Sequence, residues 1–272
     1  MSLTLWYIVM VAGLIGMVWC AKSQKRVAKA KLYAIICLVV VVISAIMALS
    51  TYFSDPENER ALANAKQFDR AKLNQIAEFV NKNYAGKKAV ILIHQDMIPN
   101  PDADYVRLDQ EKELKSFLKG VTVLDTVVIR PPKNAGGEDS AVPEEVSYSA
   151  PVFNEKFEEC RKLQPDVIIN LAGLPMGEES RKLKVWRWKS KNDPKLVLSE
   201  VNDIGICFEP ADLLTVLDCV ILSRNDRKFN YLEDTASKDL KEAFDSLYVL
   251  VTKDNLGQLK KDNVITIYEP SK

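Results

Sequence analysis

The only histidine of the chain, His94, ends an apolar run and stands two residues before Asp96. An imidazole beside a carboxylate can do general acid–base chemistry or activate a nucleophile, because the carboxylate orients the ring and stabilises its charged form. A hydrolase would also need a positioned nucleophile, and the sequence contains no Gly-x-Ser-x-Gly turn. We therefore favour a structural histidine, and we keep an envelope hydrolase using His94 and Asp96 as the alternative.

Polar residues follow four of the predicted strands at the point where each strand ends. In an open parallel sheet, ligands bind beyond the carboxyl ends of the strands. That rule selects a ligand-binding rim of His94, Gln95, Asp96, Arg130, Asn170, Gly173, Glu200, Asn202 and Asp203. Side chains of these types can hydrogen-bond a small polar solute, and ordinary turn chemistry is the alternative explanation for them.

Neither a cofactor nor a metal is expected. The turn between Gly173 and Gly177 precedes a predicted helix, but it matches neither phosphate-binding glycine pattern. Glu178 and Glu179 would occupy the first turn of that helix and already complement its dipole. The sequence also lacks a Cys-x-x-Cys pair, so nothing in it has the spacing of a zinc site.

The cysteines are predicted to be free thiols rather than a disulfide framework. Cys20 and Cys37 fall in apolar runs near the start of the chain, and Cys160, Cys207 and Cys219 fall in the later domain. Because the domain holds an odd number, at most one pair can form there, and Cys207 with Cys219 is the candidate. Their apolar neighbours favour buried thiols instead.

A basic stretch at residues 181–195 carries interleaved tryptophans on a predicted helix, 178–189. A basic helix with aromatic residues can lie on anionic lipid or contact an acidic protein. The residues predicted for such a partner or lipid surface are Lys184, Arg187, Trp188 and Lys189. The alternative is a solvated helix face with one tryptophan in the core.

The domain that carries these residues is predicted to follow a transmembrane hairpin, residues 1–54. Its spans are 3–20 and 32–53, which contain no charged side chain, and a basic loop at 21–31 joins them. Each span is about the length that crosses a hydrocarbon core of ~30 Å as a helix. A cleaved signal peptide and a pair of buried soluble helices are the two alternatives.

The charges around the hairpin predict its orientation. The loop carries five basic residues and no acidic residue, whereas Asp55, Glu57 and Glu59 follow the second span. Short loops rich in lysine and arginine stay in the cytoplasm. We therefore expect an inner (plasma) membrane protein with the bulk of the chain outside the cytoplasm. Small residues on both spans let the helices pack on each other or on a partner helix.

The rest of the chain is predicted to be a stalk or docking helix, 55–85, followed by one Rossmann-like α/β domain, 86–272. Apolar runs alternate with amphipathic helices, which is typical of a mostly parallel sheet with helices on both faces. The predicted strands are 88–94, 121–130, 166–171, 195–200, 218–223, 247–252 and 264–268. The predicted helices are 57–84, 107–119, 153–163, 178–189, 210–217 and 236–246. Two lobes divided near residues 172–176 are the alternative arrangement.

The charge of this domain argues against general nucleic-acid binding. Residues 55–272 carry 32 basic and 37 acidic side chains, since the only charges before residue 55 are the five of the loop. A mildly acidic domain repels a phosphate backbone.

Three segments together resemble a lobe of the periplasmic substrate-binding proteins. They are Ala-Val-Ile-Leu-Ile at 89–93, Val-Val-Ile-Arg-Pro at 127–131, and the helix-to-strand run at 157–169, which contains Pro-Asp-Val-Ile-Ile. The resemblance covers residues 86–225 and implies a Rossmann-like lobe that binds a ligand. Members of that family usually have two lobes and a longer chain.

These observations favour a membrane-anchored extracytoplasmic module that binds a small polar solute or an envelope partner. The absence of catalytic patterns makes an enzyme the second interpretation. A structural subunit of a membrane assembly is the third, and small-residue helix faces and the basic stretch would then contact other chains.

Overall fold

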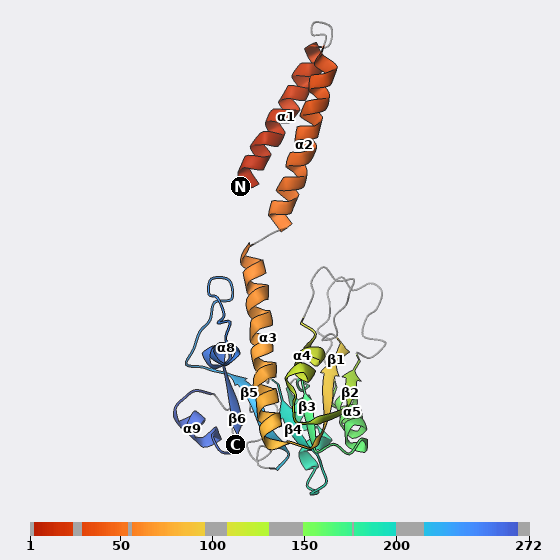
Figure 1. Ribbon diagram of the computed structural model, residues 1–272, viewed down its shortest axis with the longest axis vertical. Helices are drawn as coiled ribbons and strands as arrows, with labels where there is room; N and C mark the ends of the chain where they lie inside the picture. Colours follow the sequence, from red (N-terminus) through yellow and green to blue (C-terminus); the bar gives the residue numbers. More distant parts are fainter. Residues whose placement is uncertain are drawn as a thin grey trace. The chain divides into compact units, whose positions relative to one another are not determined.

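The α/β part of the chain is built on one six-stranded sheet (Figure 1). The computed structural model describes residues 3–23, 29–53, 56–95, 108–130, 149–175, 177–199 and 215–265. The strand order is β2-β1-β3-β4-β5-β6. The strands are β1 (Lys88–His94), β2 (Thr122–Ile129), β3 (Val167–Asn170), β4 (Lys195–Leu198), β5 (Leu217–Ser223) and β6 (Tyr248–Thr252). Each coincides with a predicted apolar run.

The prediction of a mostly parallel sheet is confirmed, with one antiparallel edge strand. Neighbouring strands from β2 to β5 are parallel, and β6 runs against β5. The connection from β5 to β6 begins and ends at the same end of the strands. The Arg224 N–H, just after β5, donates to the carbonyl of Leu247, just before β6, at 2.8 Å. The helix in that connection, α8 (Leu240–Leu247), therefore leads straight into β6 without crossing the sheet.

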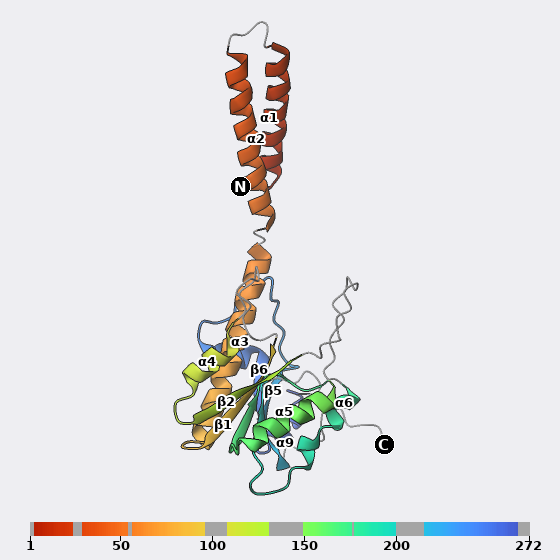
Figure 2. The ribbon, with the colours of Figure 1, turned by 90° about the vertical axis from the view of Figure 1, so that its right-hand side faces the viewer.

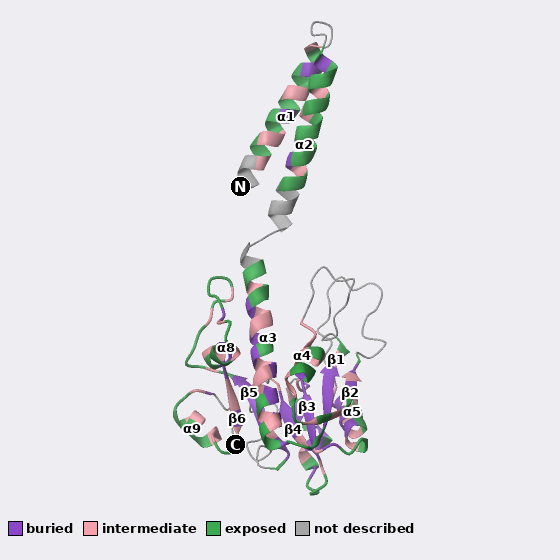
Figure 3. Cartoon of the chain, viewed as in Figure 1, coloured by how far each residue is buried: buried purple, intermediate pink, exposed green. Residues whose placement is uncertain are grey.

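Both faces of the sheet are covered, as continuous apolar runs require. Along β1, Val90 and Leu92 join one apolar layer while Ala89, Ile91 and Ile93 join the other, and all five are buried. The first layer packs under α5 (Ala150–Lys162), the 3₁₀ helix η2 (Lys184–Arg187) and α9 (Leu256–Lys261). The second packs under α3 (Pro56–Asn83), α4 (Gln110–Phe117) and α8. Figure 2 shows α4 and α5 on opposite sides of the strands, and Figure 3 shows how deeply those strands are buried.

Helix α3 contributes a buried stripe to the second layer. Phe68, Ile76 and Val80 are at most 1% exposed, and their spacing of eight and four residues keeps them on one helix face. The predicted helix, residues 57–84, thus matches the observed one closely. Docking on the domain begins at Asn64, which is 3% exposed.

Polar contacts fasten α3 to its neighbours on two sides. The Asn64 amide nitrogen donates to the carbonyls of Tyr231 (2.9 Å) and Asp234 (2.8 Å), and its oxygen accepts from the Ala236 N–H (2.9 Å). Both donor hydrogens and the oxygen of this buried amide therefore have partners.

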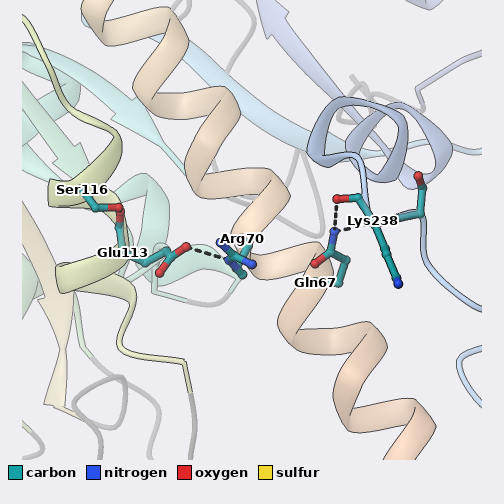
Figure 4. Close-up of polar contacts among 6 residues, drawn as sticks. Gln67, Arg70, Glu113, Ser116 and Lys238 are labelled. Atoms are coloured by element: carbon teal, nitrogen blue, oxygen red, sulfur yellow. Dashed lines mark hydrogen bonds and ion pairs between the residues drawn. The ribbon is translucent and has the colours of Figure 1, made fainter.

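One turn further along α3, Gln67 donates to the carbonyls of Ser237 (2.7 Å) and Lys238 (3.2 Å). Arg70 points the other way and donates to Glu113 of α4 at 2.7 Å (Figure 4). Helix α3 is thus held between α4 and the segment that precedes α8.

The carboxyl end of α3 is joined to the sheet by Tyr84, whose hydroxyl donates to the Asp218 carboxylate on β5. Burial, and then this bond, raise the pKa of Tyr84 above its ordinary value. A folded-state pKa above the unfolded one means that the contact stabilises the fold below the ordinary tyrosine pKa of about 10, and that this stabilisation is lost above it.

The chain up to Ala63 forms a separate unit, which contains the first residues of α3 and two antiparallel helices, α1 (Leu3–Ser23) and α2 (Ala30–Phe53). Both are long and apolar enough to cross a membrane by length and composition. A side chain added at Gly13 would come within 2.6 Å of Val41, and one at Gly16 within 2.9 Å of Cys37. The small residues of α1 therefore pack on α2.

The predicted helix 178–189 is wrong, because the chain there forms α6 (Glu178–Arg181) and η2, with a break between them. Leu183, Val185 and Trp188 are all buried, and one continuous helix would point them in different directions. Asn154 of α5 bonds the backbone groups freed by the break, accepting from Lys184 N–H at 2.6 Å. The local sequence pattern gives no sign of this hydrogen bond, because Asn154 lies in another helix.

Other boundaries differ by a few residues, for local reasons. Helix α5 begins at Ala150 rather than 153, since the first turn of a helix tolerates a proline. Helix α8 begins at Leu240 rather than 236, where the Asp239 carboxylate caps two backbone N–H groups. The predicted helix at 210–217 and strand at 264–268 lie mostly outside the described residues.

We predict that Asn64→Ala lowers the free energy of unfolding of the α/β part by about 3 kcal/mol, because three hydrogen bonds are lost and the buried Ala236 N–H is left without its partner. Unfolding of the full chain in detergent, followed by near-UV circular dichroism, measures this. Asn74→Ala on the same helix is the control, since its amide bonds only the exposed Glu78 side chain. It should change stability by less than about 0.5 kcal/mol, and equal losses in both variants would contradict the argument.

Candidate functional site

The carboxyl ends of β1 and β3 meet at the point where the strand order reverses. From β1 the chain moves outward to the edge strand β2, and it then returns past β1 to form β3. Leu92 of β1 is aligned with Asn170 of β3, and His94 lies two residues further along. Ligands of open parallel sheets bind at such a reversal.

His94 and Asn170 share one face of the sheet. Val90 and Leu92 belong to the layer under α5, so the alternation along β1 assigns His94 to that side. Ile168 belongs to the same layer, and Asn170 follows it by two residues. His94 is partly buried and Asn170 is fully buried. The geometry thus brings these two predicted site residues to one place.

Asn170 is satisfied on only one side of its amide. Its nitrogen donates to the Gly173 carbonyl at 2.7 Å, whereas its oxygen Oδ1 has no hydrogen-bond partner within the described structure. A buried polar atom without a partner costs about 1–3 kcal/mol. Such atoms are uncommon and are found where water or a ligand supplies the missing partner.

The loop after β3 explains why Asn170 takes this position. Gly173 has a φ of +76°, which a residue with a side chain rarely adopts, and this turn brings its carbonyl back to the Asn170 amide. The N–H groups of Leu171 and Ala172 both donate to the Leu92 carbonyl. Asn170 is therefore held rigidly beside β1.

The end of β4 closes the other side of this loop. The Ser199 N–H donates to the Asn170 carbonyl at 3.0 Å, and its hydroxyl donates to the Leu171 carbonyl at 3.3 Å. Ser199 was not among the predicted site residues. Its place directly after the strand is the signal that could have selected it.

The remaining rim residues divide between the described structure and the rest of the chain. Gln95 follows β1 and Arg130 follows β2, and both are exposed. They lie at the same end of neighbouring strands, since His94 of β1 is aligned with Ile129 of β2. The alternation along β2 assigns Arg130 to the opposite face from Asn170. Four predicted members lie outside the described residues: Asp96, Glu200, Asn202 and Asp203.

A carboxylate of the protein already occupies the amino end of α5, the helix that follows the carboxyl end of β2. The Ala150 N–H donates to Glu179 Oε2 at 3.1 Å. The hydrogen bond from Lys182, and then that from Ala150, lower the pKa of Glu179, so it is ionised at neutral pH. A bound anion would have to displace Glu179, so this helix end does not recruit anions.

The two described cysteines of the α/β part are buried, which disfavours their reactive thiolate form. Burial raises the pKa of the Cys160 thiol to about 12. Burial, and then Asp218, raise that of Cys219 well above its ordinary value. Both are free thiols, and the expected alternative partner Cys207 lies outside the described residues. Within the described ranges, no three potential ligands come together as a metal site would require.

The residues predicted for a partner or lipid surface do not share one environment. Lys184, Arg187 and Lys189 are exposed, but Trp188 is only 6% exposed. Its ring packs edge-on against Phe157 in the first apolar layer. The three basic residues therefore form an exposed surface to which the Trp188 ring does not contribute.

Comparison of the chain with protein-family models, curated proteins and solved structures gave no match. The likeness to substrate-binding proteins stays an expectation from three short segments, and function has to be argued from the geometry.

We predict that Asn170→Leu leaves the free energy of unfolding within about 1 kcal/mol of the natural protein, or raises it slightly. The substitution removes one hydrogen bond but also the unpaired oxygen, and the two effects are of similar size. Denaturant unfolding of the full chain measures this. A loss above about 2 kcal/mol would contradict the expected balance between the lost hydrogen bond and the removed unpaired oxygen.

Proposed function

We propose that the chain is a membrane-anchored, extracytoplasmic binding module that recognises a small polar solute at the carboxyl ends of β1 and β3. The observation that carries the proposal is the buried, unpaired oxygen of Asn170 beside the only histidine, where the strand order reverses. In this proposal the domain is a doubly wound, Rossmann-like fold.

The exposure of α1 and α2 supports the membrane anchor. Only 11% of each candidate span is buried, whereas a core helix of a soluble protein would be mostly buried. Large apolar side chains face outward along the hairpin, such as Ile15 (66% exposed), Trp19 (60%) and Ile46 (59%). In water this surface would be costly, and lipid removes that cost.

The orientation follows from the basic residues between the helices. Lys22, Lys25, Arg26, Lys29 and Lys31 lie in or beside the connection of α1 and α2, and no acidic residue accompanies them. The positive-inside rule assigns such a connection to the cytoplasm. Both ends of the chain and the α/β part would then lie outside.

The chemistry of the site narrows the class of solute. Oδ1 of Asn170 accepts hydrogen bonds, so the solute must present a hydroxyl, an amide N–H or an ammonium group. Glu179 excludes an anionic group at the amino end of α5. We therefore expect a neutral or cationic solute, such as a polyol, an amide or an amine. Because Oδ1 is covered in this structure, binding requires the rim to open.

We predict that alkaline phosphatase fused after Lys272 is active in cells, because this reporter matures only outside the cytoplasm. The same reporter fused after Lys29 should be inactive, since that site belongs to the basic connection. Comparable fusion protein levels must be shown by immunoblotting. An inactive fusion at Lys272 with an active one at Lys29 would reverse the proposed orientation.

We predict that a solute of this class raises the melting temperature of the full chain in neutral detergent, and that Asn170→Leu abolishes the rise. A ligand at about 100 times its Kd stabilises the folded state by about 2.7 kcal/mol, which is easily measured. The screen compares polyols, amides and amines with carboxylates of similar size. Stabilisation only by carboxylates, or equal stabilisation of the variant, would contradict the proposed site.

A further inference from the structure

A concave site lies at the amino ends of β4 and β5, at the opposite end of the strands from Asn170. Its pocket, of about 470 Å³, is lined by Trp188, Lys189, Ser190, Lys191, Lys195 and Thr215, together with three neighbouring residues. Lys195 is the first residue of β4, and Thr215 precedes β5 by two residues. This pocket shares no residue with the proposed solute site and does not depend on it.

The lining carries a net positive charge. It contains three lysines and one carboxylate, Asp193. That carboxylate accepts from Arg161 at 2.6 Å and from the Ser190 N–H at 2.7 Å, so its charge is already balanced. Lys189 and Lys191 are exposed and form no ion pair within the described part of the chain.

Two side chains of the pocket wall, Trp188 and Lys195, are held in place by contacts within the domain. The Arg161 guanidinium lies 5.3 Å from the centre of the Trp188 ring, whose other contacts are in the apolar layer. Lys195 donates to the Thr215 carbonyl at 2.5 Å, which holds its ammonium group at the rim. Fixed walls reduce the entropy lost when a ligand binds.

We propose that this pocket binds a phosphate-bearing anion. Three ammonium groups around one small concavity match a compact ligand with several negative charges, and lysine binds phosphate as a point charge. A carboxylate carries a single charge and leaves more of this field unbalanced. The source is either a soluble phosphate compound or the headgroup of an anionic phospholipid, since both present the same group.

The test is isothermal titration of the full chain in neutral detergent with sodium tripolyphosphate and, separately, with glycerophosphoglycerol, a deacylated lipid headgroup. Saturable binding of tripolyphosphate alone identifies a soluble phosphate ligand. Tighter binding of the headgroup identifies a lipid. Saturable binding of neither overturns the proposal.

The paired variant Lys189→Gln with Lys191→Gln should weaken binding at least about tenfold, because it removes two of the three ammonium groups. Lys184→Gln with Arg187→Gln is the matched control. It removes the same charge from the neighbouring exposed segment, outside the pocket, and should weaken binding less than about twofold. Equal weakening by both pairs would mean diffuse attraction and would overturn the site. All four side chains are exposed, and circular dichroism verifies that both variants fold.

Discussion

Burial of the interior strands β1 and β3 on both faces is the constraint on which this structure depends. The five residues from Ala89 to Ile93 are at most 1% exposed, and so are Val167, Ile168 and Ile169 of the neighbouring strand. Strands of this kind are stable only if helices cover both sides. One cover is α5, and the other is α3, the helix that follows the apolar hairpin along the chain. The same helix thus follows the apolar hairpin along the chain and belongs to the core of the α/β part.

Two buried asparagines show how such a core treats polar groups differently. Asn64 uses its whole amide to bind the segment from Tyr231 to Ala236, and its burial therefore fastens α3. Asn170 uses its nitrogen alone, in the turn that ends at Gly173. An unpaired buried oxygen opposes folding, so its presence in a tightly built turn is better explained by binding than by stability. The contrast separates a structural amide from a candidate functional one.

The sequence was sufficient for features that depend on local pattern, and insufficient for those that depend on distant partners. Apolar runs predicted all six strands, and helical spacing predicted α3, because burial on both faces leaves a strong local signal. The break near Leu183 depends on Asn154 in another helix. Likewise, the sequence predicts that Glu179 complements the dipole of the helix in which it lies, whereas in the structure it accepts a hydrogen bond from the first residue of α5. Position at a strand end selected Asn170, but only the structure shows that its oxygen is unpaired.

The most direct test of the central claim is native mass spectrometry of the full chain, purified in mild detergent from the cells that make it. If the oxygen of Asn170 marks a solute site, the natural protein carries a reproducible extra mass of a small polar compound, and Asn170→Leu does not. Fragmentation of that adduct would identify the compound. A bare mass for the natural protein, or the same adduct on Asn170→Leu, would contradict the account and would leave the oxygen to a buried water.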